Sequence, residues 1–161
     1  MNSKETYKHI DTDDTFITLH DCYATEMVVK DDCLTVYFDN GFWITSEHEL
    51  SKLTDTVRTD SSRVDYYFDQ SLSDEISVYI FRENIFKKTI RKQWSIQKLT
   101  KLINTKSFSL EFLYQYKGGY EQLYDCWLHF QKKPYHYECQ LRIPVTKVTY
   151  CWNDLCPDKK W

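Results

Sequence analysis

Residues 121–143 read EQLYDCWLHFQKKPYHYECQLRI, and the alternation in this stretch decides the fold class. A turn at Lys132-Lys133 places residues whose numbers sum to 265 opposite each other. On one face the opposing pairs are Tyr124 and Leu141, Cys126 and Cys139, Leu128 and Tyr137, and Phe130 and Tyr135. On the other face they are Asp125 and Gln140, Trp127 and Glu138, and His129 and His136. The stretch therefore predicts an antiparallel hairpin with one buried face and one polar face.

The composition of the rest of the chain agrees with this prediction. Aromatic residues make up 17% of the 161 residues, whereas alanine, the best helix former, occurs once, at Ala24. This excludes a helix bundle, and three glycines and three prolines exclude a collagen-like or low-complexity chain. At this length we expect a single domain over residues 1–161, because no linker interrupts the sequence.

Further strands follow from the same alternation. Residues 23–38 predict a hairpin with its turn at Asp31-Asp32 and with Thr25 opposite Phe38. A loop at Asp39-Asn40-Gly41 then reverses the chain and places Phe42 opposite Phe38, as in a meander. Residues 64–68, 76–80 and 108–116 also alternate and predict strands, the last one without interruption.

Two segments have helical signals. Ser95 is placed to cap a helix near residues 95–104, in which Ile96, Leu99, Leu102 and Ile103 follow helical spacing. Ser46 and Glu49 have capping-box spacing, which predicts a short helical turn near residues 47–53 that includes Leu50 and Leu53. The fold class is thus mainly β, with antiparallel meander sheets that form a curved sheet, a barrel or a sandwich.

Charge divides the chain into two halves. Residues 1–86 carry 7 basic and 18 acidic side chains, and residues 87–161 carry 14 basic and 6 acidic ones. The acidic half and the basic half either pack together or present faces of one sign to partners. Four acidic side chains fall close together in a predicted loop and are the candidate partner-binding residues: Glu47, Glu49, Asp55 and Asp60.

Location and redox state also follow from the sequence. No apolar run approaches the ~20 residues of a membrane-spanning helix, and residues 1–14 are polar where a signal peptide would be apolar. We therefore expect a cytoplasmic protein that does not associate with membranes, with its six cysteines present as thiols.

No motif predicts a catalytic or metal site. Cys126, His129, His136 and Cys139 have zinc-like spacing, but residues three apart on a strand point to opposite faces. Consecutive strand residues also keep His20-Asp21-Cys22 from forming a catalytic relay. The acidic run of residues 11–14 lacks the glycine and the distal glutamate of a calcium loop and is interpreted as a solvated tail. We expect no cofactor and no metal, and a function that is more consistent with binding than with catalysis.

Two alternative functions stay open. One is a small-molecule-binding protein or enzyme with an aromatic-lined pocket inside a curved sheet. The other is a nucleic-acid contact by residues 87–106, which hold seven basic side chains, no acidic one, and Trp94. The same basic residues also suit the solvated face of a helix, and a pI of 5.9 disfavours nucleic acid as the partner.

A resemblance favours a third function. The motif Leu19-His20-Asp21-Cys22, followed by a hairpin that ends in Asn40-Gly41-Phe42-Trp43, resembles the opening of small all-β bacterial proteins. In size and aromatic content the chain is similar to immunity proteins that neutralise polymorphic toxins. The resemblance implies a cytosolic, non-enzymatic protein that binds another protein, such as a basic toxin, and it assigns no site residue.

Overall fold

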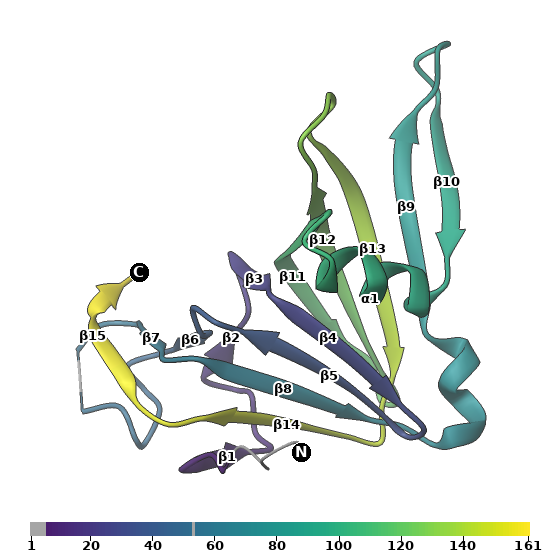
Figure 1. Ribbon diagram of the computed structural model, residues 1–161. Helices are drawn as coiled ribbons and strands as arrows, with labels where there is room; N and C mark the ends of the chain where they lie inside the picture. Colours follow the sequence, from purple (N-terminus) through teal and green to yellow (C-terminus); the bar gives the residue numbers. More distant parts are fainter. Residues whose placement is uncertain (1–5, 53) are drawn as a thin grey trace.

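The computed structural model describes residues 6–52 and 54–161, which form three antiparallel sheets (Figure 1). The five-stranded sheet has the spatial order β1 (His9–Asp11), β14 (Lys147–Trp152), β8 (Ser62–Tyr67), β5 (Cys33–Phe38) and β4 (Glu26–Lys30). The six-stranded sheet has the order β10 (Thr89–Trp94), β9 (Ser77–Glu83), β13 (His136–Pro144), β12 (Glu121–His129), β11 (Ser109–Lys117) and β3 (Cys22–Ala24). The four-stranded sheet has the order β15 (Leu155–Lys160), β7 (Val57–Thr59), β6 (Trp43–Ile44) and β2 (Ile17–Thr18).

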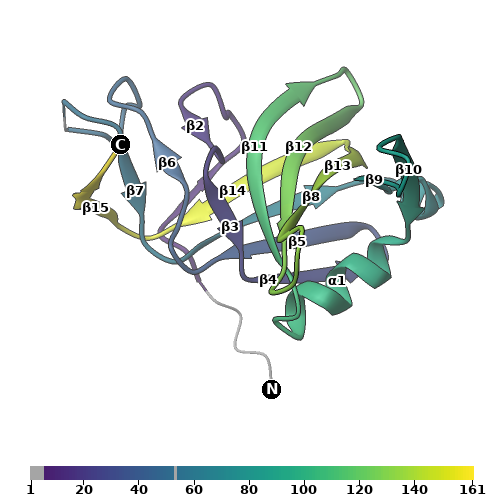
Figure 2. The ribbon, with the colours of Figure 1, turned by 90° about the horizontal axis from the view of Figure 1, so that it is seen from above.

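The five- and six-stranded sheets pack against each other and enclose the core. Residue Thr25 joins β3, at the edge of one sheet, to β4, at the edge of the other, so the chain crosses between the sheets at a bend. Helix α1 (Ile96–Asn104) contacts β4, β9 and β11 (Figures 1 and 2). The mainly β, antiparallel prediction is confirmed, and no closed barrel forms among the described residues.

The hairpin of residues 121–143 has the predicted register. Strands β12 and β13 pair Tyr124 with Leu141, Cys126 with Cys139 and His129 with His136. Both cysteines are buried, whereas His136 is exposed. The prediction of one dry and one wet face is confirmed along β12 and β13 but is wrong at Tyr135, which was predicted on the dry face and is 54% exposed near the turn. The two cysteines and the two histidines lie on opposite faces and do not converge on a metal site.

The hairpin predicted for residues 23–38 forms from Glu26 onward, but the predicted return of Phe42 is wrong. Met27 lies opposite Val36, and the strand ladder ends at Glu26 opposite Tyr37. Thr25 still donates its N–H to the Tyr37 carbonyl at 2.8 Å, and β3 then pairs with β11. Gly41 does adopt a left-handed conformation, with φ 71°. The strand that follows it, β6, pairs with β2 and β7, so Phe42 does not return along β5.

The helical predictions have different outcomes. The Ser95 side chain accepts a hydrogen bond from the Lys98 N–H at 3.2 Å, which caps α1 as predicted. Residues 46–50 form successive turns rather than the predicted helical turn, and Leu53 lies outside the described residues. A 3₁₀ helix that the sequence did not predict, η1 (Gln70–Glu75), begins where Asp69 accepts the Ser71 N–H.

A β-bulge breaks the alternation predicted for residues 108–116. Strand β11 shifts its register against β12 between Phe112 and Tyr114, so Leu113 is an extra residue. Phe112 lies in the core opposite Cys126, and Tyr114 lies opposite Asp125. Because Asp125 lies on the face away from the core, the bulge moves Tyr114 to the outside of the six-stranded sheet.

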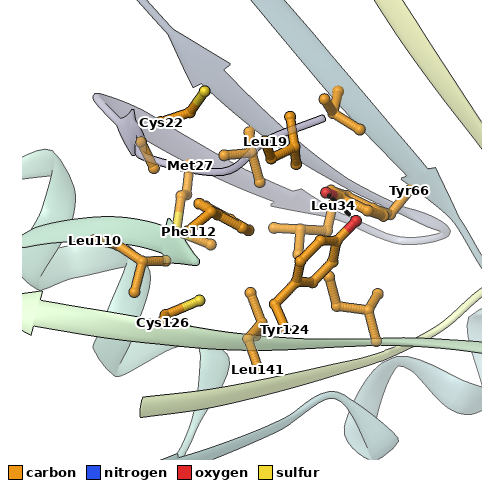
Figure 3. Packing of buried hydrophobic residues seen from close by; sticks show 14 of the residues in the cluster. Leu19, Cys22, Met27, Leu34, Tyr66, Leu110, Phe112, Tyr124, Cys126 and Leu141 are labelled. Atoms are coloured by element: carbon orange, nitrogen blue, oxygen red, sulfur yellow. Dashed lines mark hydrogen bonds between the residues drawn. The ribbon is translucent and has the colours of Figure 1, made fainter. Parts of the chain in front are cut away.

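Polar groups also lie inside the core, where the two large sheets meet (Figure 3). The hydroxyl groups of Tyr66 and Tyr124 are hydrogen-bonded at 2.9 Å, and the hydroxyl group of Tyr150 donates to Asp14 at 3.0 Å. Asp11 meanwhile lies 3.0 Å from the buried His48. The interpretation of residues 11–14 as a solvated tail is therefore wrong, because Asp11 and Asp14 anchor this segment to the fold.

The acidic and basic halves interleave in every sheet. For example, β1 of the first half pairs with β14 of the second, and β9 pairs with β13. Ion pairs such as those between Lys8 and Asp154 and between Asp14 and Lys117 also join the halves. Among the described residues, no helix is long and apolar enough to cross a membrane.

Candidate binding surface

The outer face of the six-stranded sheet carries exposed aromatic side chains. Strand register aligns Tyr23, Glu111, Trp127, Glu138 and Phe81 in one row across β3, β11, β12, β13 and β9. The exposed fractions are 42% for Tyr23, 39% for Trp127 and, in the next row, 58% for Tyr114. We call this surface the outer aromatic face and define it by Tyr23, Phe81, Tyr114, Trp127, His129 and His136.

Ring contacts connect much of this face. The centroid of the His129 ring lies 5.8 Å from that of Tyr23 and 5.9 Å from that of His136, which in turn lies 4.9 Å from Trp127. Beyond the bulge, the centroid of Tyr114 lies 5.5 Å from that of His20. The aromatic side chains thus form connected groups rather than isolated exposed residues.

Glu111 fixes one end of the outer aromatic face. Its side chain is buried beneath the rings, and its Oε2 lies 2.6 Å from Nε2 of His129. Burial and the nearby Glu111 carboxylate raise the pKa of Tyr23 to about 12, so this phenol keeps its proton at neutral pH. The Glu111 contacts hold the Tyr23 and His129 rings in place.

Two hollows are set into this side of the sheet. A trough of about 400 Å³ is lined by Phe81, Leu113, Tyr114, Asp125, Trp127, Glu138 and Gln140, together with Cys126 and Cys139. A larger hollow of about 800 Å³ lies between the β9–β10 and β12–β13 hairpins, which project in the same direction in Figure 1. Phe81 and Glu138 line both hollows, so the two adjoin at these residues, and we call them together the groove.

The four acidic residues predicted from sequence lie elsewhere, in the loops that join β6 to β7 and β7 to β8. Glu47 and Glu49 are exposed on either side of the buried His48. Asp55 is paired with Lys160 at 2.6 Å, and Asp60 accepts the Asn153 N–H at 3.1 Å. Two of the four carboxylates therefore already have partners within the chain.

The cysteine thiols are not activated. Burial raises the pKa values of Cys22 and Cys139 to about 12, and that of Cys33 to about 11. The imidazole of His20 lies 3.0 Å from the Asp21 carboxylate, but the Cys22 thiol is buried in the core (Figure 3). In the described part of the chain, no three His, Cys, Asp or Glu side chains are arranged to hold a metal ion.

Trp94, the tryptophan of the basic segment of residues 87–106, makes its contacts within the fold. The Nζ atom of Lys98 lies 3.9 Å from the centroid of the Trp94 ring, which packs against Phe108 and the core. Trp94 is half-buried. The nucleic-acid alternative requires a free aromatic ring on which a base can stack. Because of these contacts, Trp94 does not provide one.

Sequence reasoning missed most of the outer aromatic face. Trp127, His129 and His136 were predicted on the exposed side of their hairpin, but simply as its polar side. Tyr114 was predicted on the same face as Phe112, because nothing in the local sequence marks the bulge at Leu113. The usable signal was the presence of tryptophan at an outward position of a one-sided sheet.

Comparisons with protein-family models, with curated protein sequences and with solved structures found no match. The roles of the residues above therefore rest on the geometry of this chain.

Proposed function

We propose that this chain is a non-enzymatic binding protein that receives a partner protein on its outer aromatic face. The observation that carries the proposal is the groove of two adjoining hollows beside exposed aromatic rings. Tryptophan and tyrosine are enriched at the centres of protein interfaces, because they bury a large area and lose little conformational entropy. An exposed aromatic surface of this kind typically marks an interaction site.

The groove also favours a long, protruding element of a partner over a small molecule. It runs from Tyr114 across Phe81 to Ile85, at the tip of the β9–β10 hairpin. The space between the sheets is instead filled by large buried side chains such as Phe38, Phe112 and Tyr124. A partner that follows the groove would bury the exposed ring of Trp127 and the half-buried ring of Phe81.

The specific form of the proposal is an immunity protein that acts in the cytoplasm on a basic toxin. The resemblance to immunity proteins supports this form, as does the exposure of the acidic side chains of Glu47 and Glu49. Exposed carboxylates such as Glu47 and Glu49 speed the approach of a basic partner without having to lie inside the interface. Docking on the outer aromatic face then holds the partner and covers its surface.

Site-specific photo-crosslinking in the source cells tests the proposal. A photoreactive phenylalanine analogue is placed at Trp127, and a matched control carries it at Glu26, an exposed residue of β4 in the other large sheet. We expect one dominant crosslinked protein from position 127 that is absent from position 26. Purified partner then binds the unmodified chain with 1:1 stoichiometry, and Trp127→Ala weakens binding at least about tenfold, as expected of an interface centre.

Equal crosslinking from both positions, or undiminished binding by Trp127→Ala, would contradict docking on this face. The immunity form is tested separately by expressing the identified partner in bacteria with and without this chain. Growth arrest by the partner that the chain relieves supports the immunity form. A partner that does not affect growth rules out that form and leaves a binding protein of another kind.

A further inference from the structure

The trough on the outer aromatic face has the chemistry of a cation site. We propose that it receives the guanidinium group of an arginine side chain from the partner protein. This inference rests on the proposed function and adds to it the chemical identity of the group that is recognised. The supporting observations are the placement of the aromatic walls, the two carboxylates in the lining of the trough, and the absence of a basic side chain from that lining.

Two rings flank the carboxylate of Glu138. Trp127 and Phe81 lie opposite Glu138 on the neighbouring strands β12 and β9, so the three residues occupy one row. Since adjacent strands lie about 4.8 Å apart, the two aromatic residues are separated by roughly 10 Å across the sheet. Because Trp127, Phe81 and Glu138 all line the trough, a planar group that enters it can stack on Trp127 while it faces the Glu138 carboxylate.

A second carboxylate lies at the other end of the trough. The Asp125 Oδ1 accepts a hydrogen bond from Nε2 of Gln140 at 3.0 Å, which fixes the orientation of this side chain. Tyr114 lies opposite Asp125 because of the bulge. Asp125 and Tyr114 therefore extend the site with an oriented acceptor and a third ring.

The charges of the trough are not neutralised from within. None of its lining residues is Lys or Arg. In the described part of the chain, Asp125 and Glu138 form no ion pair, and the two arginines of neighbouring rows, Arg91 opposite Phe81 and Arg142, have other partners. Arg91 stacks on Tyr79 at 4.8 Å, and Arg142 is paired with Glu121 at 2.5 Å.

Guanidinium suits this trough better than ammonium does. It is planar and weakly hydrated, so it stacks on an aromatic ring at a small desolvation cost. Its N–H groups also match a carboxylate with two parallel hydrogen bonds, which Glu138 can accept. A lysine ammonium group offers only a point charge to the same walls.

Peptide titration of the full chain tests this assignment. The probes are a capped Gly-Arg-Gly tripeptide and its citrulline counterpart, which has the same shape without the charge. Binding is followed by NMR through the indole N–H of Trp127, assigned with Trp127→Phe. We expect millimolar binding of the arginine peptide, as is usual for so small a ligand, and at least about fivefold weaker binding of citrulline, because charge contributes most of the attraction.

Variants locate the site. Glu138→Gln and Asp125→Asn keep the size of each side chain, and the spectrum reports whether the sheet is intact. We expect each to weaken arginine binding about three- to tenfold, whereas Glu26→Gln on the other sheet leaves it unchanged. Equal binding of arginine and citrulline, no binding of either, or undiminished binding by Glu138→Gln would overturn the assignment.

The two proposals fail in different ways. A partner that crosslinks at position 127 and binds Glu138→Gln as tightly as the unmodified chain shows that the surface is right and the arginine assignment wrong. Arginine binding in the trough without any crosslinked partner shows that the cation site exists and that the proposed function is wrong.

Discussion

The hydroxyl oxygens of Tyr66 and Tyr124 lie 2.9 Å apart and join the two large sheets through the centre of the core (Figure 3). Tyr66 comes from β8 and Tyr124 from β12, and both side chains are almost completely buried. Tyr124 also contacts the hydroxyl of Tyr150, which donates to Asp14. The chain of hydroxyl groups therefore satisfies polar atoms that burial would otherwise leave without partners.

Removal of the central hydroxyl is expected to destabilise the fold. Tyr124→Phe breaks hydrogen bonds to both Tyr66 and Tyr150, so we expect the free energy of unfolding to fall by about 1–3 kcal/mol. Tyr66→Phe removes only the terminal hydroxyl group of this hydrogen-bonded series, so it should lower the free energy of unfolding by less. Urea denaturation of both variants provides the measurement, and an equal loss in the two would show that the central position has no special role.

Stability is expected to fall at alkaline pH. The pKa values of Cys22 and Cys139 are raised from 9.0 to about 12 by burial, and burial also raises those of Tyr124 and Tyr150 well above 10.0. The unfolded chain releases these protons first, so the stabilising contribution of each group is complete below its unfolded pKa and is lost as pH rises toward its folded pKa. Above pH 9, each thiol should reduce the free energy of unfolding by about 1.4 kcal/mol per pH unit.

Chemical denaturation at pH 8, 9 and 10 measures this loss. Cys139→Ala is the informative variant, because it removes one titrating thiol and should flatten the decline between pH 9 and 10. Its stability at pH 8 corrects for the cavity that the substitution leaves. A free energy of unfolding that stays constant from pH 8 to 10 would contradict the protonated state of the buried thiols.

Gly41 is required where the chain turns between β5 and β6. Its φ is +71°, and a Cβ atom there would lie 2.2 Å from the backbone oxygen of Thr59. Gly41→Ala should therefore destabilise the fold by more than about 2 kcal/mol, since a left-handed backbone and a clash act together. Gly119→Ala is the matched control, because no atom lies within 4 Å of its added Cβ. A similar loss of stability in both variants would refute this explanation.

Asn104 protects the edge of the five-stranded sheet. Its Oδ1 accepts the Met27 N–H at 2.9 Å, and its Nδ2 donates to the Met27 carbonyl at 2.8 Å, so the side chain pairs with β4 as a neighbouring strand would. Asn104→Ala should lower the free energy of unfolding by about 1–3 kcal/mol. Gln97→Ala, at an exposed position of the same helix, should change it by less than about 0.5 kcal/mol.

Asn104→Asp separates the two hydrogen bonds in the same denaturation experiment. A carboxylate still accepts the Met27 N–H but repels the Met27 carbonyl, so this variant should be less stable than Asn104→Ala at neutral pH. If the aspartate variant matches the native chain, the Nδ2 contact contributes nothing.

Sequence alternation was sufficient to predict local pairings. The register of β12 and β13, the pairing of Met27 with Val36 and the cap of α1 at Ser95 all follow from short-range patterns. It was not sufficient where a long-range partner competes with a local one. Phe42 follows a well-formed glycine turn, yet β6 pairs with β2 and β7 rather than with β5, because sheet assignment depends on contacts far along the sequence.

The outer aromatic face was less predictable than the fold. Alternation showed that Trp127 points outward, but it did not show that Tyr23 and Phe81 occupy the same row, since that requires the order of five strands. The bulge at Leu113 has no sequence marker, so Tyr114 was assigned to the wrong face. The acidic residues chosen from sequence reflect local charge alone, and Asp55 and Asp60 use their charges within the chain.

The division of β12 into inward even-numbered and outward odd-numbered positions has an evolutionary consequence. If the outer aromatic face binds as proposed, substitutions at residues 125, 127 and 129 change what it recognises, whereas the interior packing at residues 124, 126 and 128 stays the same. Under the proposed immunity function, a lineage that faces a changing toxin can revise its specificity one position at a time. Its divergent descendants would then share an interior and differ in the residues that contact the toxin.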